Sequence, residues 1–126
     1  MSEDLTTPVG VESRLRQLVT DLSHAQRALA QKRDAEVAAK HVYQAARRGA
    51  ILAPDSPKVT RGGYTTADRD AWVDDNTANE HIRYDVAVAA REAAQDHLRV
   101  VRDQAMIVMA LANSIRTAYS VAGSGR

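Results

Sequence analysis

The chain has 126 residues, with 17 basic and 16 acidic side chains and no cysteine. This length allows one domain at most, and a net charge of +1 gives no argument for wholesale nucleic-acid binding. Without cysteine there are no disulfides or thiolate metal sites. The acidic N-terminus is unlike a secretory signal, and the eight-residue apolar run at 105–112 is shorter than the roughly 20 residues that cross a bilayer. We therefore expect a cytoplasmic protein without membrane contact.

Residues 1–8 have no periodicity and are expected to form a disordered tail. A helix is predicted over 9–48, because its apolar residues recur at alternating spacings of four and three, the pattern of a heptad seam. These residues are Val11, Leu15, Leu18, Leu22, Ala25 and Leu29. The register is expected to fail at Lys32 and Glu36 and to reappear one step over. The shifted row would contain Ala28, Ala35, Ala38, Val42 and Ala45.

A connection is predicted over 49–64. Gly49, preceded by two arginines, is expected to end the first helix. Two prolines and a Gly62-Gly63 pair oppose regular helix over the rest of this segment. A very small β-hairpin that pairs 51–52 with 58–60 and an irregular loop fit the sequence equally well.

A second helix is predicted over 65–122. Thr65 offers an N-cap, with Asp68 in the capping-box position. Residues 74–77 are poor helix formers, so the alternatives are one long helix bent near Asn76 or a short helix 66–75 followed by a long one. We expect the single long helix. Its seam contains Ala94, Leu98, Val101, Ala105, Val108, Ala112, Ile115, Tyr119 and Ala122, and a frayed tail is expected over 123–126.

Two long helices joined by one connection predict an all-α fold, a long, coiled-coil-like antiparallel αα-hairpin over 9–122. The start of the second helix is expected to fold back on the connection, with Trp72 as its anchor. The seam is rich in alanine and contains no phenylalanine, so it buries little area. A hairpin with so thin a core is expected to associate with itself into a helical bundle.

The run Ala105–Ala112 is apolar on every side. One neighbouring helix cannot cover such a segment, so we expect a homo-oligomer, with a dimer favoured, although burial inside the hairpin is the alternative. The predicted interface residues are Leu98, Val101, Met106, Ile107, Met109, Leu111 and Ile115.

Charge is unevenly distributed around the connection. Residues 40–61 contain five basic side chains and one acidic, and residues 64–80 contain five acidic and one basic. The two segments either pair with each other or leave the basic one free for a phosphate backbone or an acidic partner. The candidate contact residues are Arg47, Arg48, Lys58, Arg61 and Tyr64.

The sequence shows no pattern typical of a catalytic, cofactor or metal site. The four histidines lack the three- or four-residue spacing of a helical metal site. Five carboxylates cluster over 68–80, but a thin hairpin offers them no concave, partly dry site. We therefore expect a protein that is not an enzyme and that holds no metal or cofactor.

The segment Tyr64–Asp74, YTTADRDAWVD, is followed by an alanine-rich amphipathic helix that closes on SIRTAY at 114–119. This pattern, over about residues 60–122, resembles small helical proteins of unassigned function coded by tailed phages of actinobacteria and related hosts. The resemblance implies a phage-encoded, intracellular, non-enzymatic accessory protein, and so a location in the host cytoplasm. Our first hypothesis is a helical interaction protein that associates with itself and binds phage or host proteins. The alternatives are a DNA-associated accessory of a recombination or replication module and a virion assembly or scaffold component.

Overall fold

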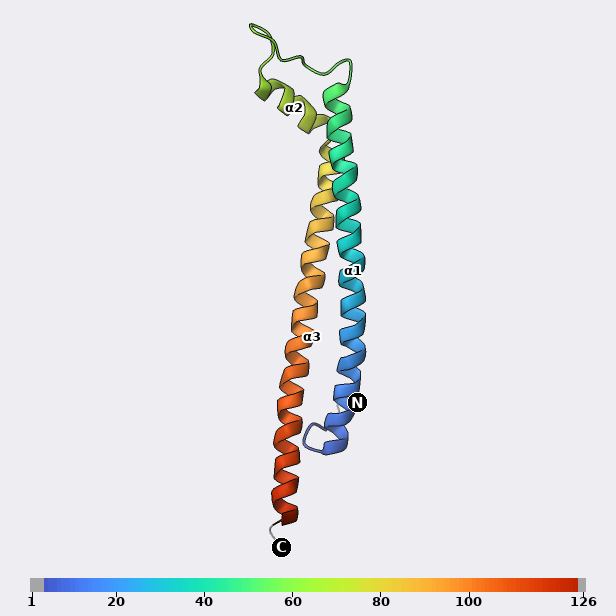
Figure 1. Ribbon diagram of the computed structural model, residues 1–126, viewed down its shortest axis with the longest axis vertical. Helices are drawn as coiled ribbons and strands as arrows, with labels where there is room; N and C mark the ends of the chain where they lie inside the picture. The colour runs from blue at the N-terminus through green and yellow to red at the C-terminus, as the bar shows by residue number, and fades with distance from the viewer. Residues whose placement is uncertain (1–3, 125–126) are drawn as a thin grey trace. The chain divides into compact units, whose positions relative to one another are not determined.

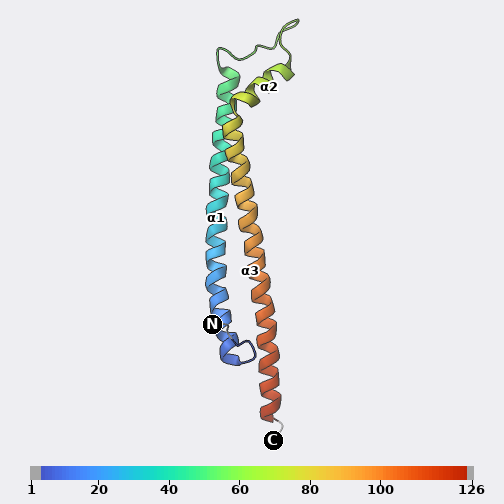
Figure 2. The same cartoon turned by 180° about the vertical axis from the view of Figure 1, so that it is seen from behind.

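The computed structural model describes residues 4–124 and contains three helices over them (Figure 1). They are α1 (Pro8–Leu52), α2 (Thr66–Asn76) and α3 (Ala78–Ser124). The described residues form no strand, and their one isolated bridge joins Val59 and Tyr64. The all-α prediction is confirmed. The chain divides into two compact units, unit 1 (Met1–Ala30 with Ala93–Arg126) and unit 2 (Gln31–Glu92), and in each of them a stretch of α1 lies beside a stretch of α3 (Figure 2).

Unit 1 is held by the predicted heptad seam. One cluster joins Val11 and Leu18 of α1 to Val108 of α3, and a second joins Ala25 and Leu29 to Leu98. Low-numbered residues of α1 meet high-numbered residues of α3, so the two segments run antiparallel. The other seam residues packed on these clusters are Leu15, Leu22, Ala94, Ala105, Ala112 and Ile115. The row predicted from the four-three spacing is therefore the core of this unit as far as Ile115, whereas its last two predicted members, Tyr119 and Ala122, are exposed.

In unit 2 the seam of α1 keeps its register, and the predicted shift is wrong. Counting on from Leu29, the four-three spacing first meets Lys32, which is exposed as a lapse of the seam would predict. It then reaches the half-buried side chains Glu36, Ala39, Tyr43, Ala46 and Ala50. Of the expected shifted row, Ala28 is half-buried, but Ala35, Ala38, Val42 and Ala45 are exposed.

Partners on α3 explain why polar residues occupy this seam. Glu36 pairs with Arg91, whose Nε lies 2.7 Å from the carboxylate. The ring of Tyr43 stacks on His81, with ring centroids 4.9 Å apart, and on Tyr84 at 6.0 Å. Glu36 and Tyr43 of α1 therefore find their partners on α3. The seam can keep its register here although it contains polar side chains.

The ends of α1 differ from the prediction. The helix runs through Gly49 to Leu52, because a glycine inside a helix costs only about 1 kcal/mol. Pro54 is the stronger stop, since it disfavours helical backbone at Ala53. At the other end, Asp4–Thr7 form a turn in which the Thr7 hydroxyl accepts from the Gly10 amide at 3.1 Å. Residues 1–3 of the expected tail, and 125–126 at the other end, lie outside the described residues.

Helix α2 ends at Asn76 and α3 begins at Ala78, with Thr77 between them. The single helix expected through Asn76 is therefore wrong, and the two-helix alternative is right. The Thr77 hydroxyl donates to the Val73 carbonyl at 2.7 Å, and its amide donates to the same oxygen at 3.0 Å. Both side chains are buried, Thr77 at 1 % exposure and Val73 at 0 %. Val73, rather than the half-buried Trp72, is the deepest anchor of α2.

The start of α2 is as predicted, because Thr65 and Asp68 form a capping box. Between the helices, residues 53–65 form an irregular loop with short turns, and Gly62 takes a φ of +82° in one of them. Ile51 and Leu52, which the β-hairpin alternative placed in a strand, belong to α1. The irregular-loop alternative is confirmed.

Candidate interaction surfaces

The seven predicted interface residues divide into two groups. Leu98 and Val101 are buried within the chain, and Leu111 and Ile115 pack against the cluster around Leu18. Leu98, Val101 and Ile115 therefore belong to the chain's own seam, whereas Leu111 lies beside the seam and is half-buried. The other three are mostly exposed, Met106 and Ile107 at 68 % and Met109 at 56 %.

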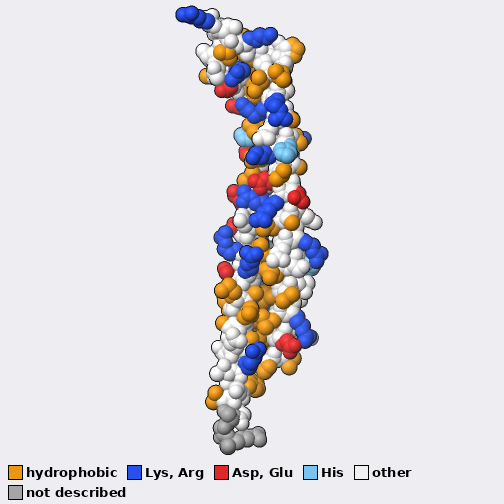
Figure 3. Space-filling model, in the orientation of Figure 1, with side chains coloured by type: hydrophobic (Ala, Val, Ile, Leu, Met, Phe, Trp, Pro, Cys, Tyr) orange, Lys and Arg blue, Asp and Glu red, His pale blue; other side chains and the backbone are white. Residues whose placement is uncertain are grey.

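Apolar side chains reach the surface of unit 1, in the lower part of the space-filling view (Figure 3). In the part of α3 that belongs to unit 1, the exposed valines and isoleucine follow a rule that the sequence analysis missed. Val100, Ile107 and Val121 are seven and fourteen residues apart, and the residues between them complete a second four-three row, one step before the seam. This outer row consists of Val100, Gln104, Ile107, Leu111, Ser114, Ala118 and Val121.

The outer row lies beside the seam and is not covered by α1. Six of its members are exposed and Leu111, on the shoulder, is half-buried. A helix with two adjoining four-three rows can pack on two other helices. In unit 1, α1 covers the seam and the outer row is left for a second partner. The signal was present in the sequence as a second heptad row.

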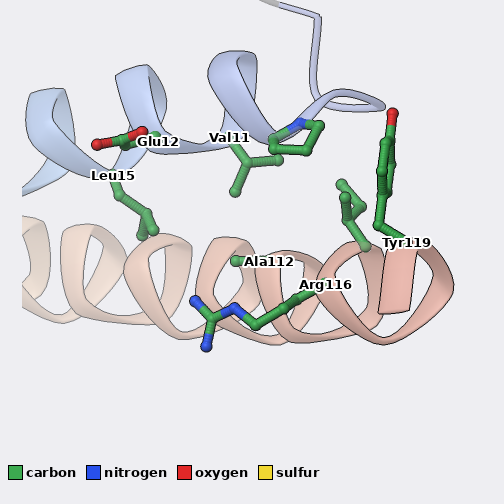
Figure 4. Close-up of a pocket in the computed structure, with 8 residues that line it drawn as sticks. Val11, Glu12, Leu15, Ala112, Arg116 and Tyr119 are labelled. Atoms are coloured by element: carbon green, nitrogen blue, oxygen red, sulfur yellow. The ribbon is translucent and has the colours of Figure 1, made fainter. Parts of the chain in front are cut away.

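A shallow apolar cleft of about 440 Å³ lies where α1 begins, between it and the last turns of α3. Val11 and Leu15 of α1 face Ala112 of α3 across it, and the Tyr119 ring stands at one end (Figure 4). Glu12 and Arg116 line its rim. The seam is therefore incompletely closed at this end of unit 1.

By length and composition alone, α3 qualifies as a candidate membrane span. It contains an 18-residue window of mean hydropathy 1.2, of which 6 % is buried. The expectation that no segment is long enough to cross a bilayer considered only the unbroken run at 105–112 and is wrong on this count. The cytoplasmic location stays a prediction.

The basic residues around the connection do not act as one group. Arg47 lies over the Tyr43 ring, 5.9 Å from its centroid, and pairs with Asp74 of α2 at 2.5 Å. The hydrogen bond that Arg47 donates to Asp74, followed by the one it donates to the Tyr43 hydroxyl, raises the pKa of Arg47. This pair is the internal pairing of basic and acidic segments that the sequence analysis weighed.

The other three cations stay free. Arg48, Lys58 and Arg61 are exposed and make no ion pair with any residue in 4–124. Lys58 and Arg61 lie in the loop with Tyr64, which is 59 % exposed, whereas Arg48 lies near the end of α1. The second interpretation, a free basic surface with one aromatic ring, therefore applies to these four residues and not to Arg47.

The acidic residues of α2 have separate structural tasks. Asp68 accepts from the Thr65 amide at 2.9 Å, and this bond, with that of the Thr65 hydroxyl, lowers the pKa of its carboxyl. Asp74 holds Arg47, and Asp70 lies 3.5 Å from Arg69. Asp75 lines a shallow groove of about 530 Å³ with Trp72. Within residues 4–124 no group of three or more histidine, aspartate or glutamate side chains is placed to hold a metal ion.

No family model, curated protein or solved structure matches the chain. Function is therefore inferred from these surfaces.

Proposed function

We propose that this protein is a non-enzymatic helical interaction protein that acts by self-association through α3. The observation that carries the proposal is the exposure of its apolar residues. Met106, Ile107 and Met109 are all more than half exposed, whereas only Val108 of the run 105–112 is fully buried. Soluble monomers rarely expose a contiguous patch of this kind.

The free energy of burial favours association. Covering each of these side chains stabilises a complex by roughly 1.5–3 kcal/mol, before the entropy cost of association is subtracted. A protein partner suits the segment better than a bilayer, because Asn113 and Arg116 fall inside its apolar stretch. An arginine near the centre of a spanning helix costs about 2.5–3.5 kcal/mol on insertion scales.

Light scattering at micromolar concentration tests this proposal. We expect the wild type to have about twice the 13.7 kDa mass of one chain, and Ile107→Glu to shift it to the monomer, because a buried charge without a partner opposes association. Val19→Glu is the matched control, since Val19 is a 67 % exposed apolar residue on α1 of the same unit. A wild-type mass near 13.7 kDa would contradict the proposal, as would equal effects of the two glutamates.

A second candidate function is contact with a phosphate backbone, as in a DNA-associated accessory of recombination or replication. It is favoured by three exposed cations that make no ion pair within residues 4–124, Arg48, Lys58 and Arg61, and by the exposed Tyr64 ring of the loop. Cationic side chains bind phosphates with release of counterions, and an exposed ring offers a base a stacking surface.

Changing Arg48, Lys58 and Arg61 together to alanine should remove salt-dependent binding to single-stranded DNA and leave the melting temperature nearly unchanged. Arg47→Ala should do the reverse. It should lower stability by up to about 1 kcal/mol, the usual value of a partly exposed ion pair, and keep the binding. Anisotropy of a labelled oligonucleotide and circular dichroism measure the two effects. DNA binding that survives in the triple variant would exclude this surface.

A further inference from the structure

We infer that two copies of this chain pair antiparallel along the outer rows of their α3 helices, with Ala110 next to the two-fold axis. The inference rests on the proposed self-association and adds the partner surface and its direction. We take a second copy of the chain as the partner of the outer row. It presents the same narrow, uncharged row, and closed dimers usually pair identical surfaces.

The outer row is complementary to itself when one copy is reversed. In that arrangement Ile107 of one copy shares a layer with Leu111 of the second, at the centre of the contact. Moving outwards, Gln104 meets Ser114 of the second copy, so a polar residue lies opposite a polar one. Val100 then meets Ala118, so the apolar layers match apolar layers at both ends.

The flanking charges favour the antiparallel direction. The row beside the outer row on its open side contains Asp96 and Asp103 in its first half, and Ala110 and Thr117 in its second half. When the helices run antiparallel, Asp103 of one copy lies near the uncharged Thr117 of the other. Asp96 pairs with Arg99 at 3.5 Å, so Asp103 carries this argument. A parallel pair would bring the Asp103 carboxylates of the two copies to the same level, where like charges repel.

Two further features agree with this direction. Ala110 is exposed and small, so its position next to the axis lets the two backbones approach closely. Antiparallel helices also oppose their macrodipoles, which is the more favourable alignment. The contact is built from unit 1 alone and includes no residue of the free basic surface.

Single cysteine variants test the geometry, because the chain has no cysteine of its own. With a short bismaleimide crosslinker, Ala110→Cys should form covalent dimers by itself. Val100→Cys and Ala118→Cys should each fail alone, because like positions then lie roughly 27 Å apart at 1.5 Å per residue. A mixture of these two variants should crosslink. Val19→Cys on the outer face of α1 is the control for random collision.

The outcomes separate this inference from the proposed function. A dimeric mass with self-crosslinking of Val100→Cys, and none in the mixture, would overturn the antiparallel direction and leave self-association standing. A dimeric mass with no crosslink above the Val19→Cys control would show that another face associates. A monomeric mass would overturn both, and flotation of that monomer with vesicles of phosphatidylcholine and phosphatidylglycerol would assign the apolar face to a membrane.

Discussion

Replacing Leu18 with alanine should lower the free energy of unfolding by about 2–5 kcal/mol, the range found for leucines deleted from well-packed cores. Leu18 is 1 % exposed and joins Val11 and Val108 in the main cluster of unit 1. The residues around it include Ala105 and Ala112, whose methyl groups are too short to fill the space that the leucine leaves. The hole should therefore persist.

Val19→Ala is the matched control, because it truncates the next residue of the same helix at a side chain that is 67 % exposed. A change at such a position should stay within about 0.5 kcal/mol. Urea unfolding followed by circular dichroism measures both variants, and chain concentration must be held constant because self-association shifts apparent stability. Equal midpoints for the two variants would show that the α1–α3 seam does not hold the fold.

The polar pair in the seam of unit 2 should respond in opposite ways to single and double replacement. Glu36→Ala leaves the Arg91 guanidinium, only 25 % exposed at its side chain, without the carboxylate 2.7 Å away. The half-buried guanidinium would then keep the more distant Glu92 carboxylate, 3.9 Å away, as a counter-charge. Loss of the closest partner of a partly buried charge destabilises a fold, so the melting temperature should fall. Replacing both residues with leucine fills two seam positions with apolar side chains and should raise the melting temperature by roughly 5 °C.

Asp96→Ala serves as the control for this pair, since Asp96 lies 3.5 Å from Arg99 on the surface and both side chains are about two-thirds exposed. Its removal should change the melting temperature little. Differential scanning calorimetry of the wild type and these three variants measures the order of their melting temperatures. If the double-leucine protein melts below the wild type, the Glu36–Arg91 pair stabilises the seam more than apolar packing can.

The heptad rows of unit 1 could be predicted from the sequence because burial there depends only on periodicity. From Val11 to Leu29 and from Ala94 to Ile115, each row member is apolar and each lies in the core. The capping box of α2 was predictable for a similar reason, since Thr65 and Asp68 are three residues apart and need no distant partner.

The rest depended on contacts between residues far apart in the chain. Glu36 looks like a break in the seam until Arg91, 55 residues away, supplies its counter-charge. The division of the basic cluster likewise depends on Asp74 reaching Arg47. The helix ends depend on local signals that compete. α1 continues past Gly49 and ends just before Pro54, and α2 ends where the buried Thr77 hydroxyl donates to the Val73 carbonyl.

The irregular loop over residues 53–65 makes the length of the connection independent of the phase of α1 and of α3. On its far side, Thr77 donates to Val73 and accepts from the His81 amide at 3.0 Å, so α2 and the start of α3 are joined by backbone bonds of their own. Residues could therefore be added or removed at the exposed Gly62-Gly63 pair without rotating either seam about its helix axis. This makes the loop a natural site for inserting a reporter peptide, and a segment whose length can vary while the helix pair stays in register.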